Sequence, residues 1–400
     1  MNKFYIYNVF PNCPLISMDC QRISDYLTAN GFSFTSCFQK ADIILITFCS
    51  ITDAMEKKSL NELRYHLKRV SPLKAVIMLE CAQGINKNLT DEESGYLPRI
   101  TTEDTSALDE ILKPVRPFSS IPEPNKIKIF SSSLLPIAAN KIITGIKDLS
   151  LMGMFRRFLE NKRTIKDRFL SEKVYHIRIS AGCYGKCAFC VRSACPPFHK
   201  SRPLDEIKKE FRRGLEEGYD LFMFVAHDTG SYGIDSGLSI DNLLGEIFKI
   251  EGNYKLILVD FGVEWLIKYF RELKPLFLKN HEKIQRLALA VQSGSDKVLQ
   301  SMERSYRRDE VIDCLLQLKS SLPGYKDKVS IQIMVGFPGE ENHDFEKTLD
   351  LVRKAGLPIV NIFGFSPRPQ TKAYSMRPRI EKTVMRERIN KLLEVRDSFR

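Results

Sequence analysis

The 400-residue sequence predicts an α/β protein, in which an N-terminal parallel α/β domain is followed by a partial (β/α)6 barrel. Apolar runs typical of buried strands alternate with helical stretches between residues 3 and 80. The same alternation resumes at residue 174 and continues to residue 366. Strands that alternate with helices in this way favour parallel sheets covered by helices.

The N-terminal domain is expected to span residues 1–90, and residues 91–172 are expected to form an irregular, partly helical connection. Within this connection, residues 114–126 are rich in Pro and Ser and are typical of a linker, whereas residues 140–169 have a basic, helical pattern. The strands of the domain are expected at Lys3–Phe10, Phe32–Phe38, Ala41–Thr47 and Lys74–Glu80, and its helices at Leu15–Asn30 and Asp53–Val70.

The barrel is expected to span residues 173–375, followed by a C-terminal helical segment at residues 376–400 with a charged helix from Thr383 to Arg400. Helices such as Leu204–Glu217 and Asp344–Ala355 separate its strands. Barrels of this kind carry their chemistry at the C-terminal ends of the strands. The six strands are expected at Val174–Ser180, Leu221–Asp228, Tyr254–Phe261, Arg286–Gln292, Val329–Gly336 and Ile359–Ser366.

The charge and hydropathy of the chain limit its compartment and its partners. No apolar run reaches the roughly 18 residues that a membrane span needs, and the N-terminus is unlike a signal peptide, so we expect a cytoplasmic monomer without membrane contact. Lys and Arg total 61 against 49 Asp and Glu, a net charge of +12. This excess favours an anionic partner such as nucleic acid, although a solvated basic surface explains it equally well.

A compact cysteine motif follows the first expected barrel strand. The run GCYGKCAFC spaces Cys183, Cys187 and Cys190 so that three thiolates lie on one loop, and soft thiolates suit an iron–sulfur cluster. Three ligands leave one iron of a 4Fe–4S cluster open for a substrate or cofactor. The alternatives are chance clustering and a zinc site completed by Cys195 or His199, because structural zinc needs a fourth ligand.

Three further cysteines follow separate strands of the N-terminal domain. Cys13 follows the first strand, Cys49 the third and Cys81 the fourth. The C-terminal ends of parallel strands share one edge of a sheet, where open α/β sheets bind ligands, so these thiols have the placement needed for a second three-cysteine cluster. The alternative is that they are unrelated buried thiols, and Cys20 competes with Cys13 as a ligand.

These residues give the chain a resemblance to the radical S-adenosylmethionine (SAM) methylthiotransferases, which insert sulfur and a methyl group into C–H bonds. The resemblance covers nearly the whole chain apart from residues 86–173. It rests on the six cysteines and on five blocks in the expected order: SRPLDEI at Ser201–Ile207, HDTGSYG at His227–Gly233, VQSGSDKVL at Val291–Leu299, VGFPGE at Val335–Glu340 and FSPRPQT at Phe365–Thr371.

The resemblance implies two 4Fe–4S clusters and SAM as cofactors. Cys183, Cys187 and Cys190 correspond to the ligands of the cluster that cleaves SAM, and Cys13, Cys49 and Cys81 to those of an auxiliary cluster. Residues expected near SAM are Phe189, Gln292, Ser293, Ser295 and Gly336, although the two serines also fit a strand-to-helix turn in which Ser295 is an N-cap. No residue is assigned as a catalytic acid, base or nucleophile.

The resemblance further implies an electron donor such as flavodoxin or ferredoxin and a sulfur donor that the sequence does not name. The expected substrate is tRNA adenosine. The alternatives are a radical enzyme acting on a peptide or small molecule, and a non-catalytic iron–sulfur protein that binds RNA. The basic stretch Arg156–Arg168 is a candidate tRNA contact, with a solvated helix face as its alternative reading.

The chain departs from the family pattern at several positions. The residues around Cys13 read Asn-Cys-Pro-Leu-Ile where the family has Gly-Cys-Gln-x-Asn, and Glu80 stands where a Gly precedes the third cysteine. His227 replaces a usual Gln and Gln332 a usual Asp. The sequence also ends at Arg400, before the position expected for the C-terminal TRAM domain of the family. These departures concern the auxiliary site and the substrate rather than SAM cleavage.

Overall fold

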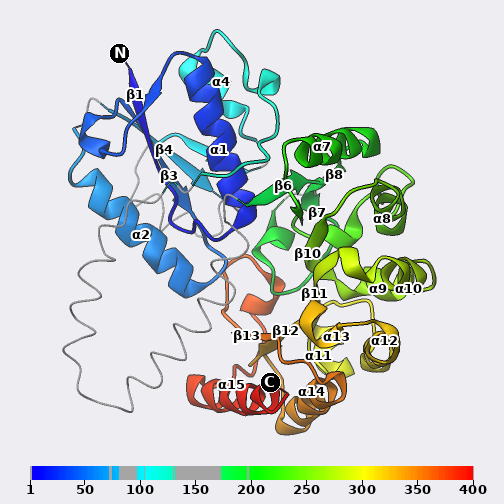
Figure 1. Ribbon diagram of the computed structural model, residues 1–400. Helices are drawn as coiled ribbons and strands as arrows, with labels where there is room; N and C mark the ends of the chain where they lie inside the picture. Colours follow the sequence, from blue (N-terminus) through cyan, green and yellow to red (C-terminus); the bar gives the residue numbers. More distant parts are fainter. Residues whose placement is uncertain are drawn as a thin grey trace, which may run out of the picture. The chain divides into compact units, whose positions relative to one another are not determined.

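The computed structural model describes residues 2–71, 74–80, 97–102, 104–128, 130, 173–195 and 198–399, and all structural statements concern these residues. Cys81, the helical stretch expected at residues 140–169 and the basic stretch Arg156–Arg168 lie outside them. The chain divides into two compact units, each built around a parallel sheet (Figure 1). No helix in the described ranges is long and apolar enough to cross a membrane.

The N-terminal unit contains a five-stranded parallel sheet in the order β2-β1-β3-β4-β5. This is one of the doubly wound strand orders, in which the chain changes direction between β1 and β3. Its elements are β1 Lys3–Tyr7, α1 Pro14–Ala29, β2 Ser33–Phe34, β3 Ile43–Phe48, α2 Asp53–Leu67, β4 Ala75–Glu80, β5 Arg99–Thr101 and α4 Ala107–Leu112.

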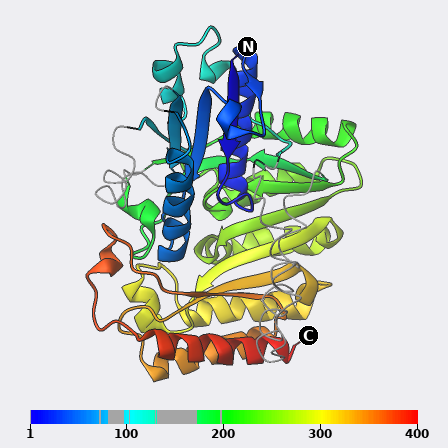
Figure 2. The same ribbon diagram turned by 90° about the vertical axis from the view of Figure 1, so that its left-hand side faces the viewer.

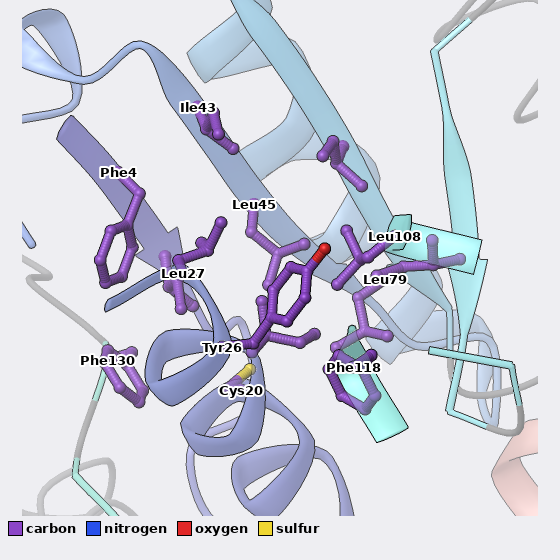
Figure 3. Close-up of a cluster of buried hydrophobic side chains, with 14 of the residues drawn as sticks. Phe4, Cys20, Tyr26, Leu27, Ile43, Leu45, Leu79, Leu108, Phe118 and Phe130 are labelled. Carbon is purple, nitrogen blue, oxygen red and sulfur yellow. The ribbon is translucent and has the colours of Figure 1, made fainter. Parts of the chain in front are cut away.

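Both faces of this sheet are buried, because successive side chains of a strand point to opposite sides. Phe4 and Ile6 of β1 join one core cluster with α1, whereas Tyr5 and Tyr7 join a second cluster that includes residues of α2. Figure 3 shows the first cluster, in which Tyr26 of α1 lies among aliphatic and aromatic side chains. Each face of the sheet therefore has its own core.

Part of the expected irregular connection belongs to this N-terminal core. Strand β5 pairs with β4, and Leu108, Phe118, Ile121 and Phe130 pack in the cluster that contains Tyr26 (Figure 3). The rings of Tyr26 and Phe118 lie 5.3 Å apart. A three-residue strand and isolated apolar side chains between turns give no periodicity, which is why the sequence pattern indicated an irregular, partly helical connection.

The second unit contains a six-stranded sheet in the order β13-β12-β11-β10-β9-β6, so its strands follow one another in chain order. Strands β9 to β13 pair in parallel, as a partial (β/α) barrel requires. All six strands expected from the sequence are present. They are β6 Val174–Arg178, β9 Leu221–Val225, β10 Lys255–Gly262, β11 Ile284–Gln292, β12 Val329–Val335 and β13 Val360–Gly364.

Helices line the outer side of this sheet (Figure 1). The last of them, α15, packs against β13 and α14, and Figure 2 shows it in red beside the orange α14. The expected C-terminal helix is therefore a layer over the edge of the barrel sheet. The helices are α7 Leu204–Glu216, α8 Ile240–Phe248, α9 Val263–Lys268, α10 Phe270–Lys279, α11 Asp296–Ser301, α12 Arg308–Ser321, α13 Tyr325–Lys328, α14 Asn342–Ala355 and α15 Lys382–Asp397.

Candidate iron–sulfur and SAM site

Cys183 lies at the end of a small hairpin that follows the first barrel strand. Strand β7, Ser180–Cys183, pairs antiparallel with β8, Phe198–Ser201, so that Cys183 lies opposite Phe198. Gly182 has φ of 76°, and a Cβ there would lie 1.9 Å from the carbonyl oxygen of Phe198. Only glycine fits this close approach in the left-handed region, so the Gly-Cys pair of the motif has a structural cause.

The loop with Cys187 and Cys190 is fixed on two sides by backbone hydrogen bonds. The amide of Ala188 donates to the carbonyl of Met302 (3.0 Å), and the amide of Ala373 donates to the carbonyl of Ala188 (2.9 Å). Phe189, expected near SAM, packs with Ala188 and Met302 in a small apolar cluster. Segments far apart in the chain thus hold the loop in one conformation.

The three motif thiols form one group. The amide of Gly185 donates to Sγ of Cys183 (3.3 Å), and a Cβ on Gly185 would lie 3.4 Å from that sulfur and 3.6 Å from Sγ of Cys187. Burial raises the pKa of Cys183 to about 12, and the pKa of Cys190 to about 11, with the neighbouring thiols adding to both shifts. Half-buried thiols gathered on one loop are a donor set that an iron–sulfur cluster fits, because bonds to iron stabilise the thiolate form.

The two residues proposed as extra zinc ligands have other partners. Sγ of Cys195 donates to the carbonyl of Val191 (3.6 Å), and Nε2 of His199 lies 3.6 Å from Asp235. Among the described residues, no three His, Cys, Asp or Glu side chains lie close enough to hold a single metal ion. A cluster does not need such closeness, because each thiolate binds a different iron atom.

An arginine that the sequence did not single out contacts the motif. Nη1 of Arg304 donates to Sγ of Cys187 (2.9 Å), while Nη2 donates to Glu264 (2.8 Å) and to the carbonyl of Ala290 (3.2 Å). Nε of Arg304 donates to the hydroxyl of Tyr306 (3.1 Å). Arg304 follows α11 and is 117 residues from Cys187, so no local pattern points to the contact.

Asp228 ties together the C-terminal ends of β9 and β10. Its carboxylate accepts from the amides of Gly230 (3.0 Å) and Gly262 (2.9 Å) and from Nε1 of Trp265 (2.6 Å). Burial raises the pKa of Asp228, although these donors and Arg304 oppose the shift. Through Asp228, the block HDTGSYG therefore joins the C-terminal ends of two strands by hydrogen bonds, at the edge of the sheet where barrels bind ligands.

Two of the expected SAM contacts use their hydroxyl groups within the protein. Ser293 and Ser295 are fully buried. Oγ of Ser295 donates to Asp344 of α14 (2.7 Å), and Oγ of Ser293 lies 3.4 Å from the hydroxyl of Thr348. Ser295 occupies the N-cap position of α11, but its side chain makes no cap hydrogen bond. These contacts dock the turn after β11 onto α14.

Gln292 and Gly336 lie at the ends of two neighbouring strands, and both have a backbone conformation in the left-handed region. Gln292 has φ of 69° at a shift in the β11–β12 register, which is uncommon for a residue with a side chain. Gly336 has φ of 78°, and a Cβ there would lie 2.6 Å from the terminal methyl of Met385 in α15. The space beside Gly336 is therefore filled by the C-terminal helix, whereas strain at Gln292 is typical of a functional position.

Two of the departures from the family pattern lie in the barrel sheet, His227 just after β9 and Gln332 in the middle of β12. Burial lowers the pKa of His227 to about 3, helped by Arg192 and Arg178, so its imidazole is neutral at physiological pH, as the amide of a Gln is. Gln332 of β12 donates to Asp260 of β10 (3.3 Å).

The cysteines of the N-terminal unit follow the strands as expected. Cys13 follows β1 and is the N-cap residue of α1, and Cys49 follows β3. Strands β1 and β3 are neighbours, and the switch point between them is where doubly wound sheets bind ligands. Cys20 is 0% exposed within the apolar core beside Tyr26, so it lies apart from the strand ends (Figure 3).

The loop that carries Cys13 is held by a chain of hydrogen bonds. The amide of Val9 donates to the hydroxyl of Thr47 at the end of β3 (2.8 Å), and the side-chain amide of Asn8 donates to Oγ of Ser17 (2.9 Å). Oγ of Ser17 in turn donates to the carbonyl of Pro11 (3.0 Å). The position of Cys13 is thus set by polar contacts between the β1 loop, β3 and α1.

Comparison with known families matches both units. A model of the radical SAM superfamily matches residues 177–352, and one described as uncharacterized protein family UPF0004 matches residues 7–97. The first match contains the motif Cys183-x3-Cys187-x2-Cys190, and the second contains Cys13, Cys49 and Cys81. Each of the two cysteine sets therefore lies in its own matched domain.

Curated relatives match this chain over long segments. Threonylcarbamoyladenosine tRNA methylthiotransferase MtaB of Thermotoga maritima is 34% identical over 231 residues, which are 58% of this chain and 52% of the relative. The tRNA-2-methylthio-N(6)-dimethylallyladenosine synthase of Thermotoga petrophila is 27% identical over 375 residues, or 93% of this chain and 76% of the relative. This chain thus spans about half of the first relative and three quarters of the second.

A solved structure shares the fold. The radical SAM methyltransferase TsrM from Kitasatospora setae has a TM-score of 0.55 at 10% identity, over 94% of this chain and 77% of TsrM. At that identity the likeness concerns the fold alone. The radical SAM superfamily implies a 4Fe–4S cluster and SAM, and methylthiotransferases carry a second cluster. Over both matched domains, the chain is therefore similar to radical SAM methylthiotransferases.

Proposed function

We propose that this chain inserts a methylthio group into a C–H bond of a tRNA adenosine. The observation that carries the proposal is the group of half-buried thiols on the loop after the first barrel strand, with Gly185 between two of them. The substrate is inferred from the curated relatives, which are named as enzymes of modified adenosines in tRNA. The net charge of +12 supports an anionic substrate.

Cys183, Cys187 and Cys190 would hold the cluster and leave one iron open for SAM. When bound and reduced, that cluster supplies the electron that cleaves SAM to a 5′-deoxyadenosyl radical. The contacts of Arg304 and Asp228 fix the loop and the strand ends around it. Gln292, with its left-handed backbone at the end of β11, remains a proposed SAM contact, as do Phe189 and Gly336.

Cys13, Cys49 and Cys81 would hold the auxiliary cluster, which would supply the sulfur for methylation by SAM and transfer to the substrate. Cys13 and Cys49 lie on the two sides of the β1–β3 switch point, which supports this assignment. In the overall change, the substrate carbon would lose a hydrogen atom to the 5′-deoxyadenosyl radical, which becomes 5′-deoxyadenosine, and would gain a methylthio group. A flavodoxin or ferredoxin would supply the electrons, and a cytoplasmic location and a monomeric state go with this proposal.

The auxiliary assignment predicts a specific loss of iron. Replacing Cys13, Cys49 and Cys81 together by Ala should halve the iron of the reconstituted protein, from about eight to about four atoms per chain, because each three-cysteine site holds its own 4Fe–4S cluster. Cleavage of SAM to 5′-deoxyadenosine should persist, since the other ligands are intact. Iron is measured by a chelator assay and 5′-deoxyadenosine by chromatography.

Cys20→Ala is the matched control for this experiment. Cys20 is on the same helix as the Cys13 cap but lies in the apolar core, so its loss should leave the iron content unchanged. Unchanged iron in the triple variant would rule out the auxiliary cluster. Equal losses in Cys20→Ala and Cys13→Ala would instead show that the ligand had been misassigned.

The tRNA proposal predicts binding that depends strongly on salt. Affinity for unmodified tRNA should fall steeply between roughly 50 and 200 mM salt, because phosphate contacts release counterions. Reversing Arg156, Arg157, Lys162 and Arg163 to Glu should weaken binding while SAM cleavage without substrate continues. Filter binding across a salt series gives the slope, and affinity that is absent at low salt or unaffected by these reversals would favour a peptide or small-molecule substrate.

The decisive test of function is a comparison of tRNA nucleosides from cells with and without the gene. Mass spectrometry should find a methylthio-adenosine nucleoside only when the gene is present. Anaerobic reduction of the purified protein with SAM separates an enzyme from a non-catalytic RNA-binding protein, because only the enzyme forms 5′-deoxyadenosine. If the protein forms 5′-deoxyadenosine but the tRNA nucleosides are unchanged, the result would indicate that the substrate is a peptide or a small molecule.

A further inference from the structure

The contact between Arg304 and Cys187 joins a fixed positive charge to a cluster ligand. The guanidinium lies 2.9 Å from Sγ of Cys187, and the Arg304 side chain is only 7% exposed. Water therefore screens this charge weakly, and its effect on the sulfur is larger than that of a surface arginine.

The rest of the guanidinium is held in place on its other sides. Nη2 donates to Glu264 and to the carbonyl of Ala290, and Nε donates to the hydroxyl of Tyr306. That hydroxyl donates to the carbonyl of Val291 (2.7 Å), which fixes it to the end of β11. A planar fork with this many contacts cannot turn away from Cys187 without breaking several of them.

The two charges beside the motif have opposite effects on an electron added to a cluster there. A cluster reduced by one electron carries one more negative charge, so a charged N–H donor to a ligand sulfur favours the reduced state. The carboxylate of Glu264 has the opposite effect, and its ion pair with Arg304 (2.8 Å) limits the influence of the guanidinium.

We propose that Arg304 is a positioning residue that raises the reduction potential of the cluster on Cys183, Cys187 and Cys190, and that Glu264 moderates this effect. The inference rests on the proposed function, because it requires a cluster at this motif. It adds a role for two residues that lie 40 positions apart in the chain and that act through the sulfur of Cys187.

The test measures the midpoint potential of the reconstituted full-length protein without SAM, by redox titration with dithionite and mediators followed by electron paramagnetic resonance. The relevant signal is the one that is absent from Cys187→Ala. Arg304→Gln should shift the ratio of reduced to oxidised cluster at a fixed potential about tenfold towards oxidised, which is about 59 mV for one electron. Glu264→Gln should shift the ratio in the opposite direction.

Arg308→Gln is the control for loss of one positive charge. Arg308 begins α12 four residues after Arg304, and its guanidinium pairs with Asp309 and Asp350 rather than with a thiol. Its potential should equal that of the unaltered protein. A damaged fold would not produce shifts of opposite sign in Arg304→Gln and Glu264→Gln, so the pair of variants separates an electrostatic role from a structural one.

Two other outcomes overturn the inference. Equal potentials in Arg304→Gln and the unaltered protein would show that Arg304 does not change the reduction potential of the cluster. Weaker SAM binding in Arg304→Gln would show that Arg304 binds the SAM carboxylate instead. If Arg304→Gln does not fold, Arg304→Lys replaces it and should shift the ratio in the same direction by less, because one ammonium cannot reproduce the fork. If the unaltered protein and Cys187→Ala gave the same paramagnetic resonance spectrum, no cluster would be bound at this motif, and the proposed function itself would be contradicted.

Discussion

Replacing any one of Cys183, Cys187 and Cys190 by Ala should abolish formation of 5′-deoxyadenosine from SAM. Each thiolate binds a different iron atom, and alanine offers no ligand in its place. Arg304, which contacts Cys187, does not compensate, because a guanidinium has no lone pair for iron. The product is measured by chromatography after anaerobic reduction with excess SAM.

Cys195→Ala is the matched control, since Cys195 lies five residues after Cys190 and its thiol donates to the carbonyl of Val191. The control should retain SAM cleavage. Retained cleavage in any of the three motif variants would contradict the assignment of the cluster ligands. If Cys195→Ala lost SAM cleavage but kept a normal fold by circular dichroism, the result would favour the alternative in which Cys195 is a metal ligand.

Arg388→Ala should destabilise the barrel unit by about 3–5 kcal/mol, the usual cost of leaving one partner of a buried ion pair alone. Nη1 of Arg388 in α15 donates to Glu340 of the VGFPGE block (2.6 Å), and the Glu340 side chain is fully buried. The same carboxylate accepts from the amide of Gly336 (2.7 Å). Urea denaturation followed by circular dichroism measures the change in unfolding free energy.

Arg386→Ala is the control on the same helix, because Arg386 is exposed, and its effect should stay below about 0.5 kcal/mol, as for ordinary surface substitutions. The double variant Glu340→Gln/Arg388→Met should recover part of the loss, since it removes the unpaired charge. An effect of Arg388→Ala no larger than that of Arg386→Ala would show that the ion pair does not stabilise the fold.

The loss in Arg388→Ala should also depend on pH. Burial raises the pKa of Glu340, while the Gly336 amide and Arg388 oppose the shift. Without Arg388 the folded-state pKa rises further above the unfolded value, so the folded state binds the proton more tightly. The variant should therefore be closest to the unaltered protein at low pH, and the gap should widen as pH rises through the folded-state pKa of Glu340.

The sequence predicted the elements whose signal is local and repeated. All six barrel strands were found because each is a run of apolar residues between helices. Strand β5 and the apolar side chains up to Phe130 were missed, because they join the N-terminal core one at a time between turns. Periodicity cannot detect a contribution that consists of isolated residues.

The difference between local patterns and contacts of distant residues also explains which parts of the candidate site were predicted. The spacing of Cys183, Cys187 and Cys190 lies within eight residues and is visible in the sequence, whereas Arg304 reaches Cys187 across 117 residues. Ser293 and Ser295 fitted a SAM-binding block, yet their hydroxyls meet Thr348 and Asp344 of a helix about 50 residues later. The sequence pattern shows which side chains are polar, but it does not show which residues they hydrogen-bond in the fold.

The hydrogen bonds around Cys13 bear on the order in which the enzyme is assembled. The hydrogen bonds of Asn8, Ser17 and Thr47 that shape the loop are all made between protein groups. Small zinc domains are the opposite case, because they are unfolded until metal arrives. We therefore expect the loop around Cys13 to fold before metallation, so that the scaffold that delivers iron and sulfide meets a folded loop rather than a nascent chain.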